Sequence, residues 1–197
     1  MSMNQNLPSE QTNVLEIRRL MEDSLDVLRT YRHDLMNQVQ LLHAYSQMKK
    51  FDRLQEPIQN LIAEAQRHTE MSAIASPMIS YVVLTRDICY QMLHLHASYE
   101  QLETPSLPAE SRAAQVLFDL LDTVGKHSMT LLEPLRMDVW IVAFGQGYEI
   151  GWFLDSAGDS EPDFSAWAEK WMQQGIEFKQ LQEEDGIEYS IRFQAQE

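Results

Sequence analysis

The segment Thr30–Leu42, TYRHDLMNQVQLL, combines a helical repeat of apolar residues with a histidine on the opposite face. With a rotation of ~100° per residue and His33 as the reference, the apolar residues lie roughly 160° to 240° away. They form one stripe of Ile17, Met21, Leu28, Tyr31, Leu35, Val39 and Leu42. Polar and small residues lie within about 60° of His33, namely Asp26, Arg29, Thr30, Asn37, Gln40 and Ala44. The pattern predicts a solvent-exposed imidazole on a helix that is packed from behind.

The helix is predicted to run from about Pro8 to Met48, because no Gly or internal Pro interrupts the repeat. Ser9 suits the N-cap position. A second apolar series, spaced by three and four residues over 51–69, predicts a second helix. Pro57 lies about one turn inside this series, so we expect either a kink there or a helix that begins later.

Two helices joined by a tight connection form an antiparallel hairpin, here over residues 1–75. One hairpin cannot bury two apolar stripes completely. Pairing with a second copy would place four helices around a shared core. The sequence therefore predicts a homodimer held together by a four-helix bundle.

Ser76-Pro77 marks a boundary, after which the periodicity alternates between helix and strand over residues 76–197. Helices are predicted at 77–91, 108–127 and 164–174. Strands are predicted at 92–99, 137–144, 148–154, 176–181 and 187–193, with hairpin turns at 145–147 and 184–186. This order indicates an α+β domain whose helices lie on one face of a sheet.

Composition excludes several classes of function. Net charge is −15, and residues 76–197 carry 7 Lys/Arg against 20 Asp/Glu, so nucleic-acid binding is disfavoured. No run approaches the ~18 apolar residues of a membrane span, and the N-terminus does not resemble a signal peptide. A single cysteine, Cys89, fits a reducing cytoplasm and a small buried thiol. We expect a cytoplasmic protein that binds neither membranes nor nucleic acid.

His33 has the properties of a phosphoryl acceptor. An exposed imidazole is largely neutral at cytoplasmic pH, so one ring nitrogen carries a lone pair. Arg29 and Arg32 lie within one turn and can offset phosphate charge. Asn37 is a hydrogen-bond donor one turn on. Asp34 is adjacent in sequence but ~100° round the helix, so a direct bond to His33 is not guaranteed.

The segment YRHDLMNQVQLLHAYSQMKKFDRLQEPIQNLIAEAQRHTEMSAIASP, residues 31–77, resembles the helical hairpin of the sporulation initiation phosphotransferase B family. The same hairpin type occurs in citrate/fumarate-type sensor histidine kinases. The shared features are Arg-His-acid-x-x-Asn, a Lys-x-Phe-Asp turn and Ser-Pro after the second helix. They comprise Arg32, His33, Asp34, Asn37, Phe51, Asp52, Ser76 and Pro77.

The resemblance implies that His33 accepts phosphate and that Asp34 and Arg32 tune or orient it. A docking surface for a partner is expected on neighbouring positions of the same helix, namely Arg29, Asn37, Gln40, Leu41 and Ala44. The residue after the motif asparagine is often basic in the family, whereas here it is Gln38.

The second domain resembles a degenerate ATP domain of histidine kinases, an α/β sandwich. LFDLLDTVGKHSM, residues 117–129, resembles their Asn-rich helix, with Thr123 where an asparagine would follow Asp122. GWFLDSAGDSEP, residues 151–162, resembles their first glycine loop, of which Asp155 and Gly158 remain. Thr123 cannot coordinate Mg²⁺ as an amide oxygen would. The resemblance implies that no cofactor binds this chain.

The implied function is phosphoryl transfer in a His–Asp phosphorelay of the two-component type that controls sporulation initiation. A phosphohistidine at His33 would carry the group from one response-regulator receiver domain to another, with Mg²⁺ on the receiver. Two alternatives remain open. The chain is an ATP-dependent sensor-type kinase lacking its membrane part, or a non-catalytic module that sequesters a receiver.

The other histidines and the tryptophans suggest less. His94 and His96 share one face of a strand but lack a third metal ligand of clear spacing. His43, His68 and His127 have no evident partners and are expected in solvent. The four tryptophans are expected to pack in or near the core.

Overall fold

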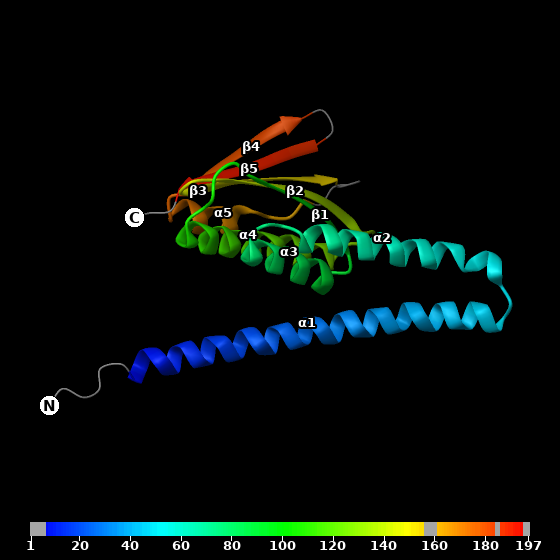
Figure 1. Ribbon diagram of the computed structural model, residues 1–197. Coiled ribbons are helices and arrows are strands. Elements are labelled where there is room, and N and C mark those ends of the chain that lie inside the picture. The colour runs from blue at the N-terminus through cyan, green and yellow to red at the C-terminus, as the bar shows by residue number, and fades with distance from the viewer. Residues whose placement is uncertain (1–6, 156–160, 184–185, 195–197) are drawn as a thin grey trace. The chain divides into compact units, whose positions relative to one another are not determined.

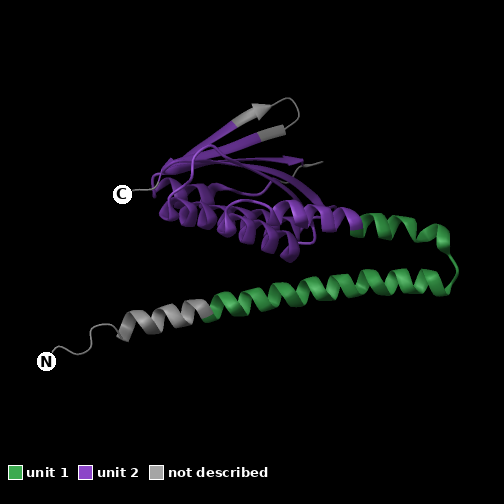
Figure 2. Ribbon diagram, in the orientation of Figure 1, with its two compact units in different colours: residues 1–61 green, residues 62–197 purple. Residues whose placement is uncertain are grey.

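The computed structural model describes residues 7–155, 161–183 and 186–194, with side chains over 18–155, 161–180 and 188–194. Contacts divide the chain into two compact units, residues 1–61 and 62–197, shown in different colours in Figure 2. The sequence placed this boundary later, between residues 75 and 76. Met71 explains the difference, because it is almost fully buried in the core of the second unit.

The first unit contains a long helix, a turn and the first part of a second helix, which continues into the second unit. Helix α1 spans Leu7–Gln47 and confirms the long predicted helix (Figure 1); the side chain of Ser9 lies outside the described residues. A short 3-10 helix, η1 (Phe51–Arg53), leads into α2 (Gln55–Ser72). Because α2 begins at Gln55, Pro57 lies in its first turn, where a backbone N–H would have no helical partner. Of the two alternatives, the later helix start is therefore correct.

Helix α1 ends in a left-handed turn. Lys49 has a φ of 51°. Its N–H donates to the carbonyl of Ser46 and the N–H of Lys50 donates to the carbonyl of Tyr45, both at 3.0 Å. These two bonds define a Schellman motif, which usually has glycine at the left-handed position. Backbone hydrogen bonds thus end the helix and reverse the chain.

Much of the apolar stripe on α1 is exposed in the single chain. The exposed fractions are 62% for Met21, 61% for Leu28, 39% for Leu35 and 45% for Val39. Ile58 on α2 is also exposed. Apolar residues in this number and spacing normally mark a surface that packs against a partner. None of the described helices combines the length and apolar character that a bilayer crossing requires.

The second unit contains every helix and strand predicted for it, each within two residues of the expected bounds. They are α3 (Pro77–Cys89), β1 (Leu93–Gln101), α4 (Leu107–Ser128), β2 (Leu135–Phe144), β3 (Gly147–Asp155), α5 (Ser165–Met172), β4 (Glu177–Glu183) and β5 (Gly186–Gln194). The expected turn at Glu184-Asp185 lies outside the described residues.

The strands form one mixed sheet with the order β1-β2-β3-β5-β4. Strands β1 and β2 are parallel, joined by the crossover helix α4, and the other neighbours are antiparallel. Figure 1 shows α3, α4 and α5 on the same face of this sheet. The α+β prediction is confirmed.

The core of the second unit lies between the sheet and its helices. The inward face of α4 is fully buried, comprising Val116, Leu117, Leu120, Leu121 and Val124. Trp152 on β3 is the centre of an aromatic cluster with Phe164, Trp167, Phe178 and Tyr189. Trp140 on β2 is half-buried over Gly151. The tryptophans thus serve packing, as expected, and α4 is held with its outer face towards solvent.

Candidate functional site

His33 stands on the exposed face of α1. Its side chain is 74% exposed, whereas that of Asp34 is 24% exposed. Leucine, methionine, glutamine and arginine favour helix throughout this segment, and no glycine or proline interrupts it. A continuous helix fixes the direction of the imidazole, so the ring is presented to solvent as the sequence predicts.

Two neighbours contact the same ring nitrogen of His33. Asp34 Oδ1 lies 3.2 Å from Nδ1, and Asn37 Nδ2 lies 3.3 Å from it. The two contacts require different tautomers, because a carboxylate accepts a proton from Nδ1 whereas an amide NH₂ donates to its lone pair. When Asp34 accepts, Nε2 carries the lone pair. The direct Asp34 contact, left open by the sequence, is therefore present.

The two predicted phosphate-binding arginines differ in their surroundings. Arg29 donates to Asp26 Oδ1 at 2.5 Å, so part of its charge is already offset. Arg32 is exposed and has no hydrogen-bond or ion-pair partner among the described residues. Arg32 is therefore the better placed of the two to meet an incoming phosphoryl group.

The expected docking surface is only partly continuous with His33. Asn37, Gln40 and Leu41 are exposed, whereas Ala44 is half-buried. Leu41 also lines a groove of about 450 Å³ at the closed end of the hairpin. The groove adds residues that the sequence did not assign to a docking surface, namely Tyr45, Asp52, Arg53, Glu56, Pro57 and Asn60. Their only signal in the sequence was the Lys-x-Phe-Asp turn.

In the second unit, the helix that resembles the nucleotide helix of kinases has its carboxylates paired within the chain. Asp119 forms an ion pair with Lys170 of α5. Thr123 Oγ1 donates to the Asp119 carbonyl at 2.8 Å, as helical threonines often do. Of the glycine-loop remnant, Asp155 ends β3 and is exposed, and Gly158 lies outside the described residues.

Asp122 lies in a denser network. It accepts hydrogen bonds from the Tyr90 hydroxyl and from Arg86 at 3.4 Å, and Lys126 lies at 2.6 Å. Burial favours the neutral carboxyl, but Lys126, Tyr90 and Arg86 outweigh it and lower the pKa of Asp122. Burial and the bond to Asp122 raise the pKa of Tyr90 to about 12. The network ties α3 to α4 at this point.

Replacing Tyr90 with phenylalanine is expected to reduce the free energy of unfolding by about 1.5–3 kcal/mol at pH 7, the usual value of a hydrogen bond to a charged group. A carboxyl with a lowered folded pKa stabilises the fold above its unfolded pKa, and this is lost as pH falls through the folded pKa. The difference between Tyr90→Phe and wild type should therefore shrink towards pH 3. Urea unfolding at pH 7, 5 and 3 measures it, and a pH-independent difference would contradict the assignment.

Most of the remaining histidines contact a polar side chain. His96 Nδ1 lies 3.2 Å from Asp138, and the described residues contain no group of three or more potential ligands that could hold a metal ion. His43 Nε2 lies 2.9 Å from Gln47. The expectation that His68 is solvated was wrong, because it is half-buried and lies 3.1 Å from the buried carboxylate of Asp87. The sequence distance of 19 residues hid this pair.

Solved structures similar to the chain are histidine kinases, at low identity. The Erythrobacter litoralis EL346 blue-light activated histidine kinase is 11% identical, with 88% of this chain and 60% of that chain covered and a TM-score of 0.46. The Acinetobacter baumannii histidine kinase AdeS is 12% identical, with 84% and 98% covered and a TM-score of 0.41. Histidine kinase ThkA, in a complex with response regulator protein TrrA, is 10% identical, with 99% and 68% covered and a TM-score of 0.41.

No curated protein matches the chain. The sequence model of one family, "Sensor_kinase_SpoOB-type, alpha-helical domain", matches residues 16–74. This segment contains α1 from its third turn onwards, His33, the turn and α2. Residues 16–74 of this chain are therefore similar to the alpha-helical domain of SpoOB-type sensor kinases.

Proposed function

We propose that this protein is a phosphotransferase of a His–Asp phosphorelay, with His33 as the phosphoryl carrier. The observation that supports it most is the exposed imidazole whose Nδ1 faces Asp34 and whose Nε2 side is not hydrogen-bonded by any described residue. An imidazole in this state is a nucleophile at Nε2. The family of the hairpin is consistent with this chemistry.

The transfer step follows from this geometry. A receiver carrying an aspartyl phosphate docks on the hairpin, and Nε2 attacks the phosphorus in line. The P–Nε2 bond forms as the P–O bond breaks, and the receiver carboxylate leaves with the bonding electrons. The Nδ1 proton remains on the ring and its positive charge is offset by Asp34. A second receiver then takes the phosphoryl group by the reverse reaction, so His33 is regenerated.

Charge neutralisation comes from both proteins. Phosphoryl transfer depends mainly on alignment and on compensating the charge of the equatorial oxygens. Arg32 is placed to contribute from this chain, and Mg²⁺ bound by the receiver would contribute from the other.

Docking of the receiver would use Gln40 and Leu41 and the groove that continues from Leu41 to Asn60. The last acceptor would be a sporulation regulator in the cytoplasm, as the resemblance of the hairpin implies.

The second unit does not fit a Mg²⁺-nucleotide. Such a site needs carboxylate or amide oxygens that are free to meet the metal. Here Asp119 is paired with Lys170, and Asp122 with Lys126, so cations of the chain itself occupy these carboxylates. Thr123 has a hydroxyl where an amide oxygen is needed. We therefore assign no ATP-dependent step to this chain.

A mixing experiment tests the proposal. The protein is incubated with a receiver domain phosphorylated on aspartate, and separately with labelled ATP and Mg²⁺. We expect acid-labile, base-stable phosphate on this chain in the first mixture and none in the second. Labelling by ATP alone would favour the kinase alternative, and binding without labelling would favour the sequestering module.

Asp34 is expected to select the reactive tautomer. In Asp34→Asn the carboxylate is lost, and the Asn37 amide can donate to Nδ1 and shift the proton to Nε2. The transfer rate should fall about 100-fold, the lower end of the range for loss of a group that positions a proton. The lower end applies because water partly replaces the carboxylate at an exposed site. Rapid-quench kinetics measure the rate, and ¹⁵N NMR of the imidazole measures the tautomer.

The matched control is Asn37→Ala, which leaves Asp34 as the only described partner of Nδ1. It should slow transfer less than Asp34→Asn and leave Nε2 unprotonated. A larger loss in Asn37→Ala than in Asp34→Asn would reverse the two roles.

A further inference from the structure

The connection between α1 and α2 carries a cluster of exposed cations and apolar side chains, here called the basic tip. It comprises Met48, Lys49, Lys50, Phe51 and Arg53. Phe51 is 64% exposed and Met48 is 52% exposed, and the three cations are exposed as well. Residues 46–55 contain these three cations and a single carboxylate, although the whole chain has a net charge of −15. The basic tip is therefore a local positive patch with an exposed aromatic ring.

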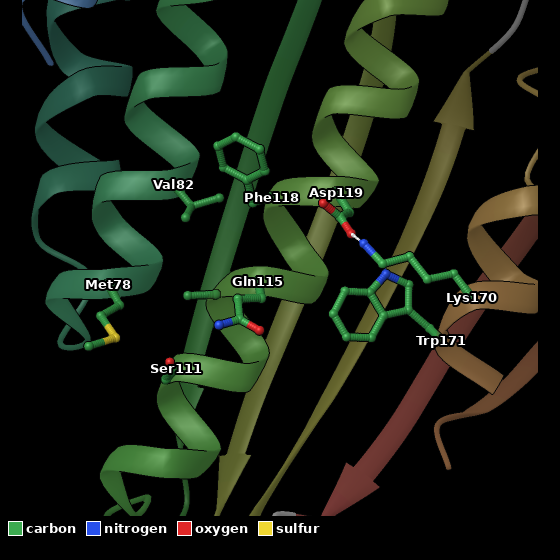
Figure 3. Close-up of a pocket in the computed structure, with 9 residues that line it drawn as sticks. Met78, Val82, Ser111, Gln115, Phe118, Asp119, Lys170 and Trp171 are labelled. Atoms are coloured by element: carbon green, nitrogen blue, oxygen red, sulfur yellow. Dashed lines mark hydrogen bonds and ion pairs between the residues drawn. The ribbon is translucent and has the colours of Figure 1, made fainter. Parts of the chain in front are cut away.

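The cations of the basic tip are not neutralised by ion pairs. Lys49, Lys50 and Arg53 form no side-chain hydrogen bond or ion pair with any described residue. The second unit shows the opposite case, since Lys170 of α5 forms an ion pair with Asp119 of α4 (Figure 3). The charge of the tip can therefore act on an approaching molecule.

Lys49 occupies a backbone position that favours glycine. Its φ of 51° lies in the left-handed region, where a side chain is sterically unfavourable. Glycine would form the same helix end with less strain. The lysine side chain thus does not serve the fold, and a strained residue of this kind points to contact with another molecule.

The basic tip lies within reach of a receiver docked at His33. Lys49 follows His33 by 16 positions, which corresponds to about 24 Å along a helix. A compact domain of about 100 residues has a radius of gyration of roughly 13 Å and is about 34 Å across. A receiver whose phosphorylated aspartate meets His33 can therefore extend along the groove from Leu41 to Asn60 and reach the tip.

We propose that the basic tip attracts the acidic receiver and forms a second contact with it, outside the reaction centre. This inference rests on the phosphotransfer function proposed above. A receiver that binds Mg²⁺ through carboxylates and carries an aspartyl phosphate is acidic. Most of this chain repels such a surface, and Lys49 and Lys50 oppose that repulsion on the hairpin. Phe51 packs against an apolar part of the receiver.

An anionic lipid surface is the less favoured partner. Cations beside an exposed phenylalanine would also be attracted to it. A bilayer is extended, however, so it would repel the acidic remainder of this chain as well.

Association kinetics of the full chain test this proposal. A fluorescently labelled receiver domain phosphorylated on aspartate is mixed with the chain by stopped flow, and transfer at saturating receiver is measured separately. Lys49→Gly with Lys50→Gln is expected to lower the association rate constant about tenfold at low salt. The rate of transfer at saturation should stay within about twofold, because the reaction centre is unchanged. At about 1 M salt, where the Debye length is about 3 Å, the difference in association should disappear.

The matched control is Arg18→Gln with Arg19→Gln. It also removes two cations from the hairpin, but about 45 Å along α1 from the tip. Association should stay within about twofold of wild type, since this distance is several Debye lengths. Glycine is favoured at position 49, so the melting temperature of the tip variant should not fall.

Phe51→Ala tests the apolar part of the contact. It is expected to raise the dissociation rate constant of the receiver about tenfold, with little change in association. Met129→Ala is its control, because Met129 is also exposed, at 55%, but belongs to the second unit.

Two kinetic results would overturn the proposal: an unchanged association rate constant in the Lys49 and Lys50 variant, or an equal loss in the Arg18 and Arg19 control. Binding of wild type to phosphatidylglycerol vesicles that the tip variant loses would also overturn it, since the partner would then be a lipid surface. Binding is measured separately from transfer. A receiver that associates as expected but leaves His33 unlabelled would therefore refute the phosphotransferase function and not the docking contact.

Discussion

Replacing His33 with alanine is expected to abolish phosphoryl transfer, by at least about three orders of magnitude, because the variant has no atom to accept the phosphoryl group. Stability should not fall. The side chain is 74% exposed, so its removal loses little packing, and alanine favours helix by up to about 0.7 kcal/mol over other residues. Phosphate incorporation from a phosphorylated receiver measures transfer, and circular dichroism during heating measures stability.

His43→Ala is the matched control for this experiment. His43 is also exposed on α1, but its ring contacts the Gln47 amide, whereas the ring of His33 contacts a carboxylate. Transfer should remain within about twofold of wild type, because a surface substitution usually changes stability by no more than about 0.5 kcal/mol and leaves the helix that carries His33 intact. Phosphate incorporation into His33→Ala, or loss of phosphate incorporation in His43→Ala, would contradict the assignment of His33 as the acceptor.

The repeat of apolar residues was sufficient to predict most of the fold. A sequence period of 3.6 or 2 reports local structure directly, so α1, α4 and all five strands were found close to their observed bounds. The same period placed His33 opposite Leu28 and Leu35, which predicted its exposure correctly. These features depend on neighbours along the chain, and the sequence contains that information.

Features that depend on distant residues were not predictable. The pair of His68 with Asp87 spans 19 residues, and that of Asp119 with Lys170 spans 51. Neither pairing has a periodic signal, because it follows from how helices pack in three dimensions. The boundary within α2 has the same origin, since Met71 belongs to the second unit through tertiary packing alone.

Charged residues within the apolar stripe of α1 are expected to prevent homodimerisation. Leu28 and Leu35 are seven residues apart, so they lie on the same face, opposite His33. Both are exposed in the single chain, at 61% and 39%. Burying a leucine side chain contributes about 1.5–3 kcal/mol, and an unpaired carboxylate at a buried interface is unfavourable in addition.

Symmetry enlarges this effect. In a twofold dimer each substitution occurs twice, so Leu28→Asp with Leu35→Asp places four carboxylates in the shared core. Taking the lower leucine value for each of the four sites gives about 6 kcal/mol, or roughly a 10⁴-fold weaker dimer. Light scattering at micromolar concentration should then report a dimer for wild type and a monomer for the double variant.

Gln40→Asp separates this effect from a loss of helix stability. Leucine and glutamine have similar helix propensities, so replacing either with aspartate weakens an isolated helix by a comparable few tenths of a kcal/mol. Gln40 is exposed on the His33 face, so Gln40→Asp should remain a dimer. A monomeric wild type, or a double variant that stays dimeric, would show that the stripe packs against something other than a second copy. Only the stripe residues face the expected interface. If Gln40→Asp dissociated the dimer as much as the double variant does, the cause would be the loss of helix stability.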